Sequence, residues 1–471
     1  MKSPDNTLYV DSAFTLTRPT AIVTLLKGNK MVSGNEYSKF TDKLLFPKIF
    51  QAFRMSIQPT KFIIIFTALA IISLAGWLMD FSKTVTVAGN GETELDRYMT
   101  DPTQVGTFIE NYKNQGQGEG VFFTLWHFGS EKYHIFLKEL FDLRFTSIAA
   151  DIADCITALR WAFRYHTLYC IIFIAIILAV TSISGGAICR ISALQVARGE
   201  KPGLTEAIRF STKRFTSFFT APLAPITIIL FIGIFIVLLG LIGNIPYVGE
   251  LIVGLSMPLT LFAGFLITVV VIGTVAGFNL MFPAIAYDGS DCFDAISRSF
   301  SYVYSRPWRM LAYTLITVVY GSICYLFVRF FAFLSLFFSH WFLRLSLWAQ
   351  NGSSEMEMNK LNSIWPEPEF MKLMVDPSTL NAANNGTEKV AAFLIYIFLL
   401  VVIGLVVSFI INFYFSANTI IYSLLRHKVD TTAFEDIYTP PDTTEVEPAE
   451  AEPEPKEQAP QKPEADPESD S

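Results

Sequence analysis

Six long apolar runs constrain this chain of 471 residues more than any other feature of its sequence. A helix needs about 20 apolar residues to cross the hydrocarbon core of a bilayer. The runs are continuous and do not alternate with polar residues, which argues against the strands of a membrane barrel. The sequence therefore predicts six transmembrane helices, at 62–80, 168–189, 219–243, 251–279, 309–334 and 390–416.

Basic residues gather beside every second gap between these runs. Residues 1–61 hold nine Lys and Arg against four acidic residues, and 190–218 hold six against two. Because Lys and Arg are kept on the cytoplasmic side of a membrane, we expect a multi-pass protein of a bacterial cytoplasmic (inner) membrane with both termini in the cytoplasm. The predicted cytoplasmic segments are 1–61, 190–218, 288–308 and 417–438, and the predicted extracytoplasmic segments are 81–167 and 335–389.

The composition agrees with a membrane protein and limits the class of partner. The chain is 52% hydrophobic and only 16% charged, which is too apolar for an ordinary soluble protein. The formal net charge of −7 comes from residues 439–471, where eleven acidic residues stand against two lysines. This Pro- and Glu-rich tail is expected to be disordered. The rest of the chain is close to neutral, so nucleic acid is not an expected partner.

A short pattern, A-[IF]-x-x-S, recurs before each odd-numbered run. Its copies are Ala52–Ser56, Ala207–Ser211 and Ala295–Ser299. Basic residues accompany all three, which favours amphipathic helices lying in the cytoplasmic headgroup layer. The predicted fold class is thus an all-α membrane protein of about six transmembrane helices in three hairpins, each hairpin preceded by a cytoplasmic amphipathic helix. The cations expected to contact anionic lipid at the cytoplasmic face are Arg54, Arg209, Lys213, Arg214 and Arg298.

The third copy lies in a longer stretch that resembles a known family. Residues 293–300 and 306–309 look like the repeat in the membrane domain of bacterial glycerophosphodiester phosphodiesterases. Over about residues 45–438 the chain is similar to uncharacterised polytopic membrane proteins of planctomycete-type bacteria. That wider likeness is carried by residues 185–190, 286–291 and 415–422. The resemblance implies a fold and a membrane location. The catalytic domain of the phosphodiesterases has no counterpart, so none of its catalytic or metal residues is carried over.

Segment 81–167 is the largest one predicted to lie outside the membrane. Residues 148–163 have helical periodicity, and we expect this helix to run directly into the second span. His127, Glu131 and His134 have the spacing of one helical face, which is a pattern seen at metal sites. However, Gly129-Ser130 resembles a helix start that would break this face, so no metal site is predicted.

The apolar pattern of the fifth run continues to Trp348 and contains one cation, Arg329. At about 1.5 Å per residue, Arg329 lies roughly 30 Å beyond the start of the span, near the outer interface. There it is expected to snorkel or to find a partner. The Trp- and Phe-rich residues beyond it are expected to form a separate helix on the outer leaflet.

Two functions from different classes fit these features. The sequence lacks the motifs of hydrolases, P-loop enzymes and zinc proteases, so no catalytic, cofactor-binding or metal residue is predicted. The first hypothesis is a non-enzymatic protein that organises the bilayer or assists an envelope complex, with lipid and other membrane proteins as partners. The alternative is a transporter or permease-like protein for a small apolar or lipid-like solute. Pro222, Pro225 and Pro258 would then kink the third and fourth spans, and a cavity would expose Asn279 and Ser256.

Overall fold

The computed structural model describes residues 46–113, 117–348, 361, 364–370, 373 and 386–439. The tail that is expected to be disordered, residues 439–471, lies outside these described residues except for Thr439. Most of the expected extracytoplasmic loop 335–389 beyond Trp348 also lies outside them. The chain divides into two compact units, Met1–Ile437 and Tyr438–Ser471. All of the architecture that follows belongs to the first unit.

The described part of this unit is mostly helical, with one antiparallel pair of short strands in which Val85 pairs with Glu119. The elements before the second apolar run are η1 Phe46–Phe50, α2 Gln51–Ser56, α3 Pro59–Met79, η2 Asp80–Ser82, β1 Val85–Val87, α4 Glu94–Thr100, α5 Val105–Tyr112, β2 Gln117–Glu119, α6 Val121–Phe141 and α7 Phe145–Tyr165. The later elements are α8 Thr167–Arg198, α9 Leu204–Lys213, α10 Phe215–Thr220, α11 Ala224–Ile242, α12 Val248–Asp288, α13 Cys292–Ser305, α14 Pro307–Trp348 and α16 Gly386–Val429.

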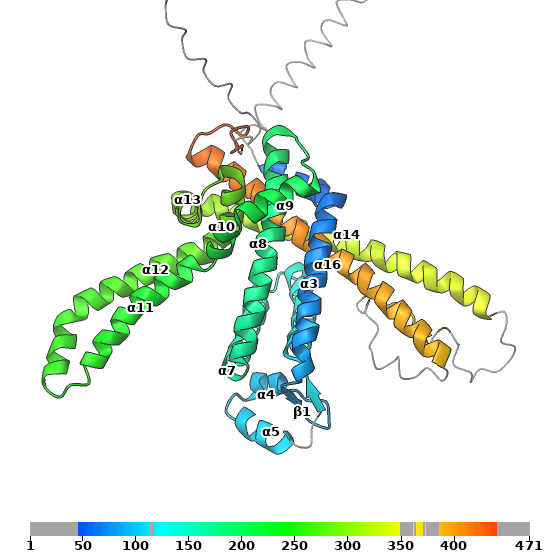
Figure 1. The fold of residues 1–471 in the computed structure, drawn as a ribbon, viewed down its shortest axis with the longest axis horizontal. Coiled ribbons are helices and arrows are strands. Elements are labelled where there is room, and N and C mark those ends of the chain that lie inside the picture. The colour runs from blue at the N-terminus through cyan, green and yellow to red at the C-terminus, as the bar shows by residue number, and fades with distance from the viewer. Residues whose placement is uncertain are drawn as a thin grey trace, which may run out of the picture. The chain divides into compact units, whose positions relative to one another are not determined.

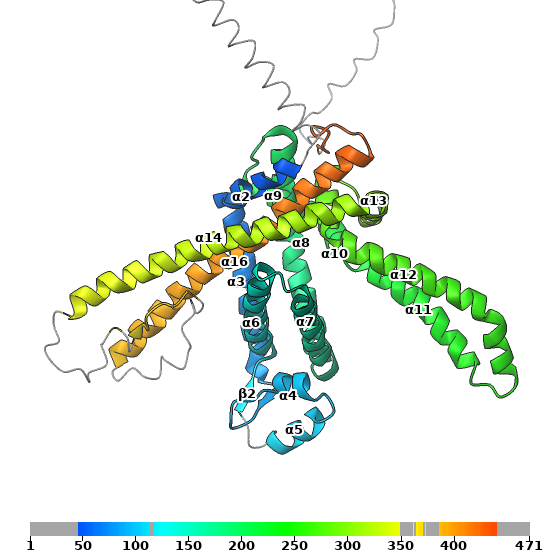
Figure 2. The ribbon, with the colours of Figure 1, turned by 180° about the vertical axis from the view of Figure 1, so that it is seen from behind.

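Six of these helices are long and apolar enough to cross a membrane: α3, α8, α11, α12, α14 and α16. This confirms the expectation of a mostly helical, membrane-embedded protein with six candidate spans. Three pairs of these helices are in contact and run side by side, namely α3 with α8, α11 with α12, and α14 with α16 (Figures 1 and 2). Only 6% of the most apolar stretch of α11 and of α12 is buried by protein, against 33% in α8.

The helices α8, α12 and α16 continue well beyond the length that a bilayer requires, and their C-terminal parts contact one another. We call this junction, together with the short helices α2, α9 and α13, the hub. Small side chains at this junction are completely buried, as in Ala187, Ala284 and Ala417. The helices α8 and α12 end at Gly199 and Gly289, whose positive φ angles close them in a left-handed conformation.

The short helices of the hub repeat one packing arrangement three times. The helix α2 contacts α16, α9 contacts α8, and α13 contacts α12. The recurring sequence pattern explains this packing, because its Ala and Ser lie one helical turn apart on the same face. Both are buried in every copy, which allows the short helix to approach the long one closely. The buried residues are Ala52, Ser56, Ala207, Ser211, Ala295 and Ser299.

Glycines in α8 allow an equally close approach. A Cβ atom on Gly186 would lie 2.4 Å from the Ser211 Oγ and 2.8 Å from the Phe218 ring. A Cβ atom on Gly185 would lie 2.6 Å from the Phe415 ring of α16. Two adjacent glycines therefore bring α8 into contact with α9, α10 and α16 at one level of the hub.

The elements from β1 to α7 form a small layer at the opposite ends of α3 and α8. Val85, Leu95, Val121 and Trp161 are buried together in its core. Asp80, which follows α3, accepts hydrogen bonds from the backbone amides of Phe122 and Phe123 at 3.0 Å each. These are amides at the start of α6, where a negative charge is favourable. The carboxylate therefore fixes the position of α6 against the end of α3.

Three local expectations differ from the structure. The helix α6 passes through Gly129 and Ser130, so the expected helix start there is wrong. Its far end packs on α14 and α16, where Tyr133 and Phe136 lie against Tyr325. This tertiary contact outweighs the cost of about 1 kcal/mol for one internal glycine.

The other two differences concern helix ends. The helix α7 does not run into α8 without a break, because His166 leaves the helical conformation between them. The expected separate helix on the outer leaflet is also wrong, at least up to Trp348, because α14 is one helix from Pro307 to Trp348. No proline interrupts it after Pro307. Pro222 and Pro225 lie in the turn before α11 and in its first turn, and Pro258 lies inside α12, which continues through it.

Replacing Gly186 by Val should destabilise the hub, because the new side chain overlaps Ser211 and Phe218. Overpacking of this kind costs about 1–3 kcal/mol. Gly233 in α11 is the matched control, since a Cβ atom there meets nothing within 4 Å. Thermal unfolding in detergent should show a lower midpoint for Gly186→Val than for Gly233→Val. Equal midpoints would show that α8 does not pack as described.

Candidate functional site

The hub contains a buried ion cluster centred on Asp288, the last residue of α12. Its Oδ1 lies 3.0 Å from the Arg426 Nε of α16, and its Oδ2 lies 3.2 Å from the Arg298 Nη1 of α13. The hydroxyl of Tyr422 on α16 also donates to Oδ2. One carboxylate therefore joins the consecutive helices α12 and α13 to α16, which lies far along the sequence.

The same cluster holds the segment that follows α16. Arg426 donates from Nη1 to the Asp436 carbonyl oxygen at 2.8 Å and lies 5.1 Å above the Tyr287 ring. The Tyr287 hydroxyl donates to the carbonyl oxygen of Phe434. Residues 430–437 are thus tied back onto the ends of α12 and α16.

The protonation states in α13 are set by these contacts. Burial opposes the charge of Arg298, but the carboxylates of Asp288 and Asp294 outweigh it and raise the pKa of Arg298 above its usual range. Burial, helped by the hydrogen bond to Asp430, also raises the pKa of Tyr302. Both groups therefore keep their protons at physiological pH. Arg298 acts as a fixed cation, and Tyr302 as a hydrogen-bond donor.

Two further cations are buried in the hub. The Lys61 side chain is fully buried between α3, α8 and α16, with its Nζ 2.8 Å from Ser192 Oγ and 3.1 Å from Ser416 Oγ. Arg190 donates from Nη1 to the Ala286 carbonyl oxygen at 3.0 Å and lies 4.5 Å above the Phe210 ring. From the sequence, Lys61 and Arg190 are expected to be solvated cations that flank a span. In the structure both side chains are buried. Buried ionisable groups of this kind are uncommon in membrane helices.

The five cations expected to contact lipid fall into two groups. Arg54, Arg209 and Lys213 are exposed on α2 and α9. Arg214 donates to the Ser290 carbonyl oxygen at 3.3 Å, and Arg298 binds Asp288. Arg214 and Arg298 therefore both contact residues at the turn between α12 and α13 and stabilise the hub. The other three cations face outward.

The two residues suggested for a cavity lie far apart. Ser256 and Asn279 both belong to α12, and 23 positions separate them, which is about 35 Å along a helix. The Ser256 hydroxyl donates to the Val253 carbonyl oxygen of its own helix at 3.0 Å. The Asn279 Oδ1 accepts from the Tyr414 hydroxyl of α16. These contacts are local packing interactions and do not bring the two side chains into one site.

Arg329 in α14 is the other cation that the sequence placed in a span. It donates from Nε to the Phe370 carbonyl oxygen at 3.0 Å and from Nη1 to the Tyr325 hydroxyl at 2.7 Å. Burial and the charge of Arg329 both lower the pKa of His134, so this ring is neutral and its Nε2 accepts from Arg329 at 2.6 Å. Within the described residues no group of three His, Cys, Asp or Glu side chains has the geometry of a metal site.

Most polar groups of the ion cluster around Asp288 form hydrogen bonds or ion pairs with one another. These contacts hold α12, α13 and α16 together. Sequence reasoning missed Arg190, Asp288 and Tyr422 as members of one site. One signal was available, because each lies in a different one of the stretches 185–190, 286–291 and 415–422 that carry the wider resemblance.

Replacing Asp288 by Asn should strongly destabilise the protein, because Arg426 would lose its buried counter-ion and keep only the exposed carboxylate of Asp436, 3.3 Å away. Breaking a buried pair in this way costs about 3–5 kcal/mol. Asp291 is a matched control two residues beyond Gly289, since it is exposed and caps α13 by accepting from the Asp294 amide. Asp291→Asn should cost at most about 1 kcal/mol. Thermal unfolding in detergent compares the two, and similar losses would contradict a central role for Asp288.

Comparison of the chain with protein-family models, with curated proteins and with solved structures found no match. The resemblance to the membrane domain of glycerophosphodiester phosphodiesterases and to bacterial membrane proteins therefore stays a prediction.

Proposed function

We propose that this protein is a non-enzymatic membrane organiser, which joins lipid and other membrane proteins through its spans and uses the hub as its rigid base. The observation that carries the proposal is the contrast in burial between the hub and the helices α11 and α12. The C-terminal parts of α8, α12 and α16 at the centre of the hub are almost completely buried, whereas only 6% of the apolar stretches of α11 and α12 is buried. Side chains such as Leu255 on α12 are 84% exposed. Surfaces of this kind are adapted to lipid or to partner helices.

The proposal places the hub at the cytoplasmic face of a bacterial inner membrane, with both termini in the cytoplasm. The basic bias of the sequence supports this orientation. The helices α2, α9 and α13 would then be the amphipathic helices that precede three transmembrane hairpins. Their exposed cations, Arg54, Arg209 and Lys213, would attract anionic lipid at about 1 kcal/mol per charge. The buried Ala and Ser of each helix would anchor it to the hub on its other face.

The second candidate function is a transporter or permease for a small apolar or lipid-like solute. One observation favours it. The Asn412 side chain on α16 is completely buried, and neither of its polar atoms has a hydrogen-bond partner. Asn412 lies one turn from Ser416, which binds Lys61. A polar seam of this kind could serve a solute, and uptake of a lipid-like solute into vesicles containing the protein would favour this function.

The membrane-facing surface of α12 can be tested by photo-crosslinking in native membranes. A photoreactive amino acid at Leu255 should form adducts with other membrane proteins, because this side chain is exposed. The same amino acid at Leu280 of the same helix should form none, because Leu280 is completely buried. Mass spectrometry of the adducts identifies the partners. Adducts to lipid alone at Leu255 would contradict a role in a protein complex.

The orientation and the lipid contact of α9 can be tested together. A cysteine at Asn244, in the turn between α11 and α12, should react with an impermeant thiol reagent in intact cells of a variant without the native cysteines. Changing Arg209 and Lys213 to Glu should reduce this labelling several-fold, because repulsion from anionic lipid disturbs the entry of α11 and α12.

The matched control for this experiment changes two exposed cations of the opposite segment, Lys113 and Arg144, to Glu. This variant should label like the parent protein. Labelling only after the cells are opened would reverse the proposed orientation. Equal labelling of both variants would remove the proposed role of the α9 cations.

A further inference from the structure

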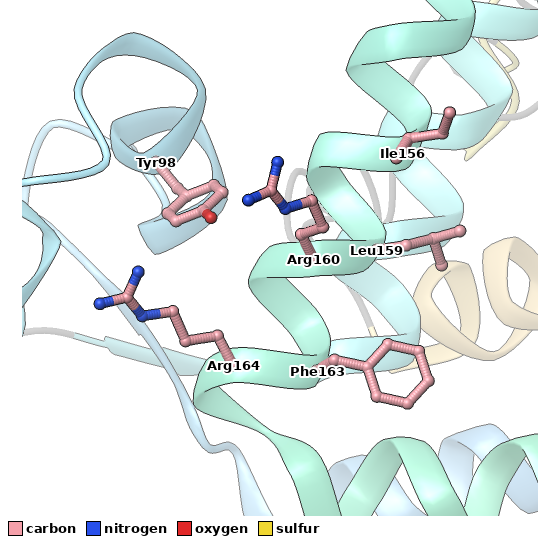
Figure 3. Close-up of a pocket in the computed structure, with 6 residues that line it drawn as sticks. All are labelled: Tyr98, Ile156, Leu159, Arg160, Phe163 and Arg164. Carbon is pink, nitrogen blue, oxygen red and sulfur yellow. The ribbon is translucent and has the colours of Figure 1, made fainter. Parts of the chain in front are cut away.

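A pocket of about 420 Å³ lies beside α7, at the end of the spans opposite the hub. Tyr98 of α4 forms one side of it, and five residues of α7 form the other (Figure 3). The α7 residues are Ile156, Leu159, Arg160, Phe163 and Arg164.

The lining of the pocket separates into a cationic and an apolar side. Arg160 and Arg164 lie one turn apart on α7 and project toward Tyr98, whereas Ile156, Leu159 and Phe163 point to the other side (Figure 3). Two like charges at this spacing repel each other and destabilise a helix. A bound anion between the two guanidinium groups would remove that repulsion.

No carboxylate among the described residues forms an ion pair with either arginine. The neighbouring acids have other partners. Asp151 and Asp154, one or more turns earlier on α7, both bind Lys132 of α6, at 3.0 Å and 2.7 Å. The buried Glu94 of α4 accepts from the Thr86 amide at 2.6 Å and lies 3.4 Å from His166. The cationic side of the pocket is therefore available to an external anion.

The apolar side belongs to an exposed stripe along α7. Its members are about half exposed, at 52% for Ile152, 54% for Ile156, 51% for Leu159 and 43% for Phe163. The sequence predicts a helical stripe of Ile148, Ile152, Cys155, Leu159 and Phe163 on this helix, and the protein leaves Ile152, Leu159 and Phe163 of it uncovered. The end of α7 is joined to the candidate span α8 by His166 alone. An apolar stripe that reaches the start of a membrane-spanning helix is in the right place to meet an acyl chain.

We propose that this pocket binds a phospholipid of the bilayer, with its phosphate between Arg160 and Arg164 and an acyl chain along the stripe. Guanidinium groups match phosphate oxygens in geometry and charge, and an acyl chain would cover the exposed apolar side chains. This site lies at the opposite end of the spans from the lipid contact proposed for α9. It does not depend on the proposed function.

The test uses the full-length protein, purified in detergent and titrated with phosphatidylglycerol that carries a photoreactive acyl chain. After irradiation, mass spectrometry locates the lipid adducts on peptides. We expect adducts on the α7 peptide that contains Ile156 and Phe163. The variant R160Q/R164Q should require about thirtyfold more lipid for half-maximal labelling of that peptide, as expected for the loss of two charges at about 1 kcal/mol each.

Two matched variants and one competitor make the result decisive. K113Q/R144Q removes two exposed cations of the same segment outside the pocket and should label like the parent protein. R209E/K213E should also leave α7 labelling unchanged, which separates this site from the α9 contact. Glycerol 3-phosphate, a headgroup without acyl chains, should compete poorly.

Three outcomes would overturn the proposal. The first is unchanged α7 labelling in R160Q/R164Q, and the second is competition by glycerol 3-phosphate at the concentration at which the lipid binds. Both arginines are exposed, so we expect the same thermal unfolding midpoint for R160Q/R164Q without lipid. If that variant does not fold, the parent protein still decides the question, because adducts found only on other helices would be the third contrary outcome.

Discussion

Asp288 has to be surrounded by donors, because a buried carboxylate that loses its water is costly unless other groups replace that water. The donors are Arg298 of α13 and Tyr422 and Arg426 of α16, and more than a hundred positions separate the first from the other two. The hub can therefore form only when these helices meet in one register. The glycines of α8 and the small residues of α2, α9 and α13 then allow the close packing that keeps water out.

The three pairs of spans differ in how many protein contacts they make outside the hub. The pair α3 and α8 is braced at its far end by Asp80, and α14 and α16 are braced by α6, whose Tyr133 and Phe136 pack on them. The pair α11 and α12 has little protein around it. Its apolar side chains gain their stability from the hydrocarbon of the bilayer, because lipid offers them the same apolar surroundings that a protein core would. Specific interactions are thus concentrated where the helices leave the apolar layer.

The six helices could be predicted because continuous apolar runs of this length have few other uses. The burial of the C-terminal parts of α12 and α16 could not be predicted. Their buried residues include Ser416, Asn418 and Tyr287, which a hydropathy scale does not count as apolar. The burial of Lys61 and Arg190 could not be predicted for a related reason. A cation at the end of an apolar run obeys the positive-inside rule equally well whether it is solvated or buried. Contacts from distant helices decide between these cases, and a single sequence does not record them.

The contact between α2 and α16 has a consequence for the synthesis of the protein. Ile49, Ala52 and Met55, near the start of the described chain, are buried against Phe409, Phe413 and Ile420, which the ribosome makes more than 350 residues later. The helix α2 therefore emerges without the partner that will cover it. Chains with such long-range closure fold slowly and expose apolar surface meanwhile. Because α16 completes the hub, a ribosome that stops before α16 would leave a membrane-inserted chain whose hub stays open and whose α2 is a target for proteases.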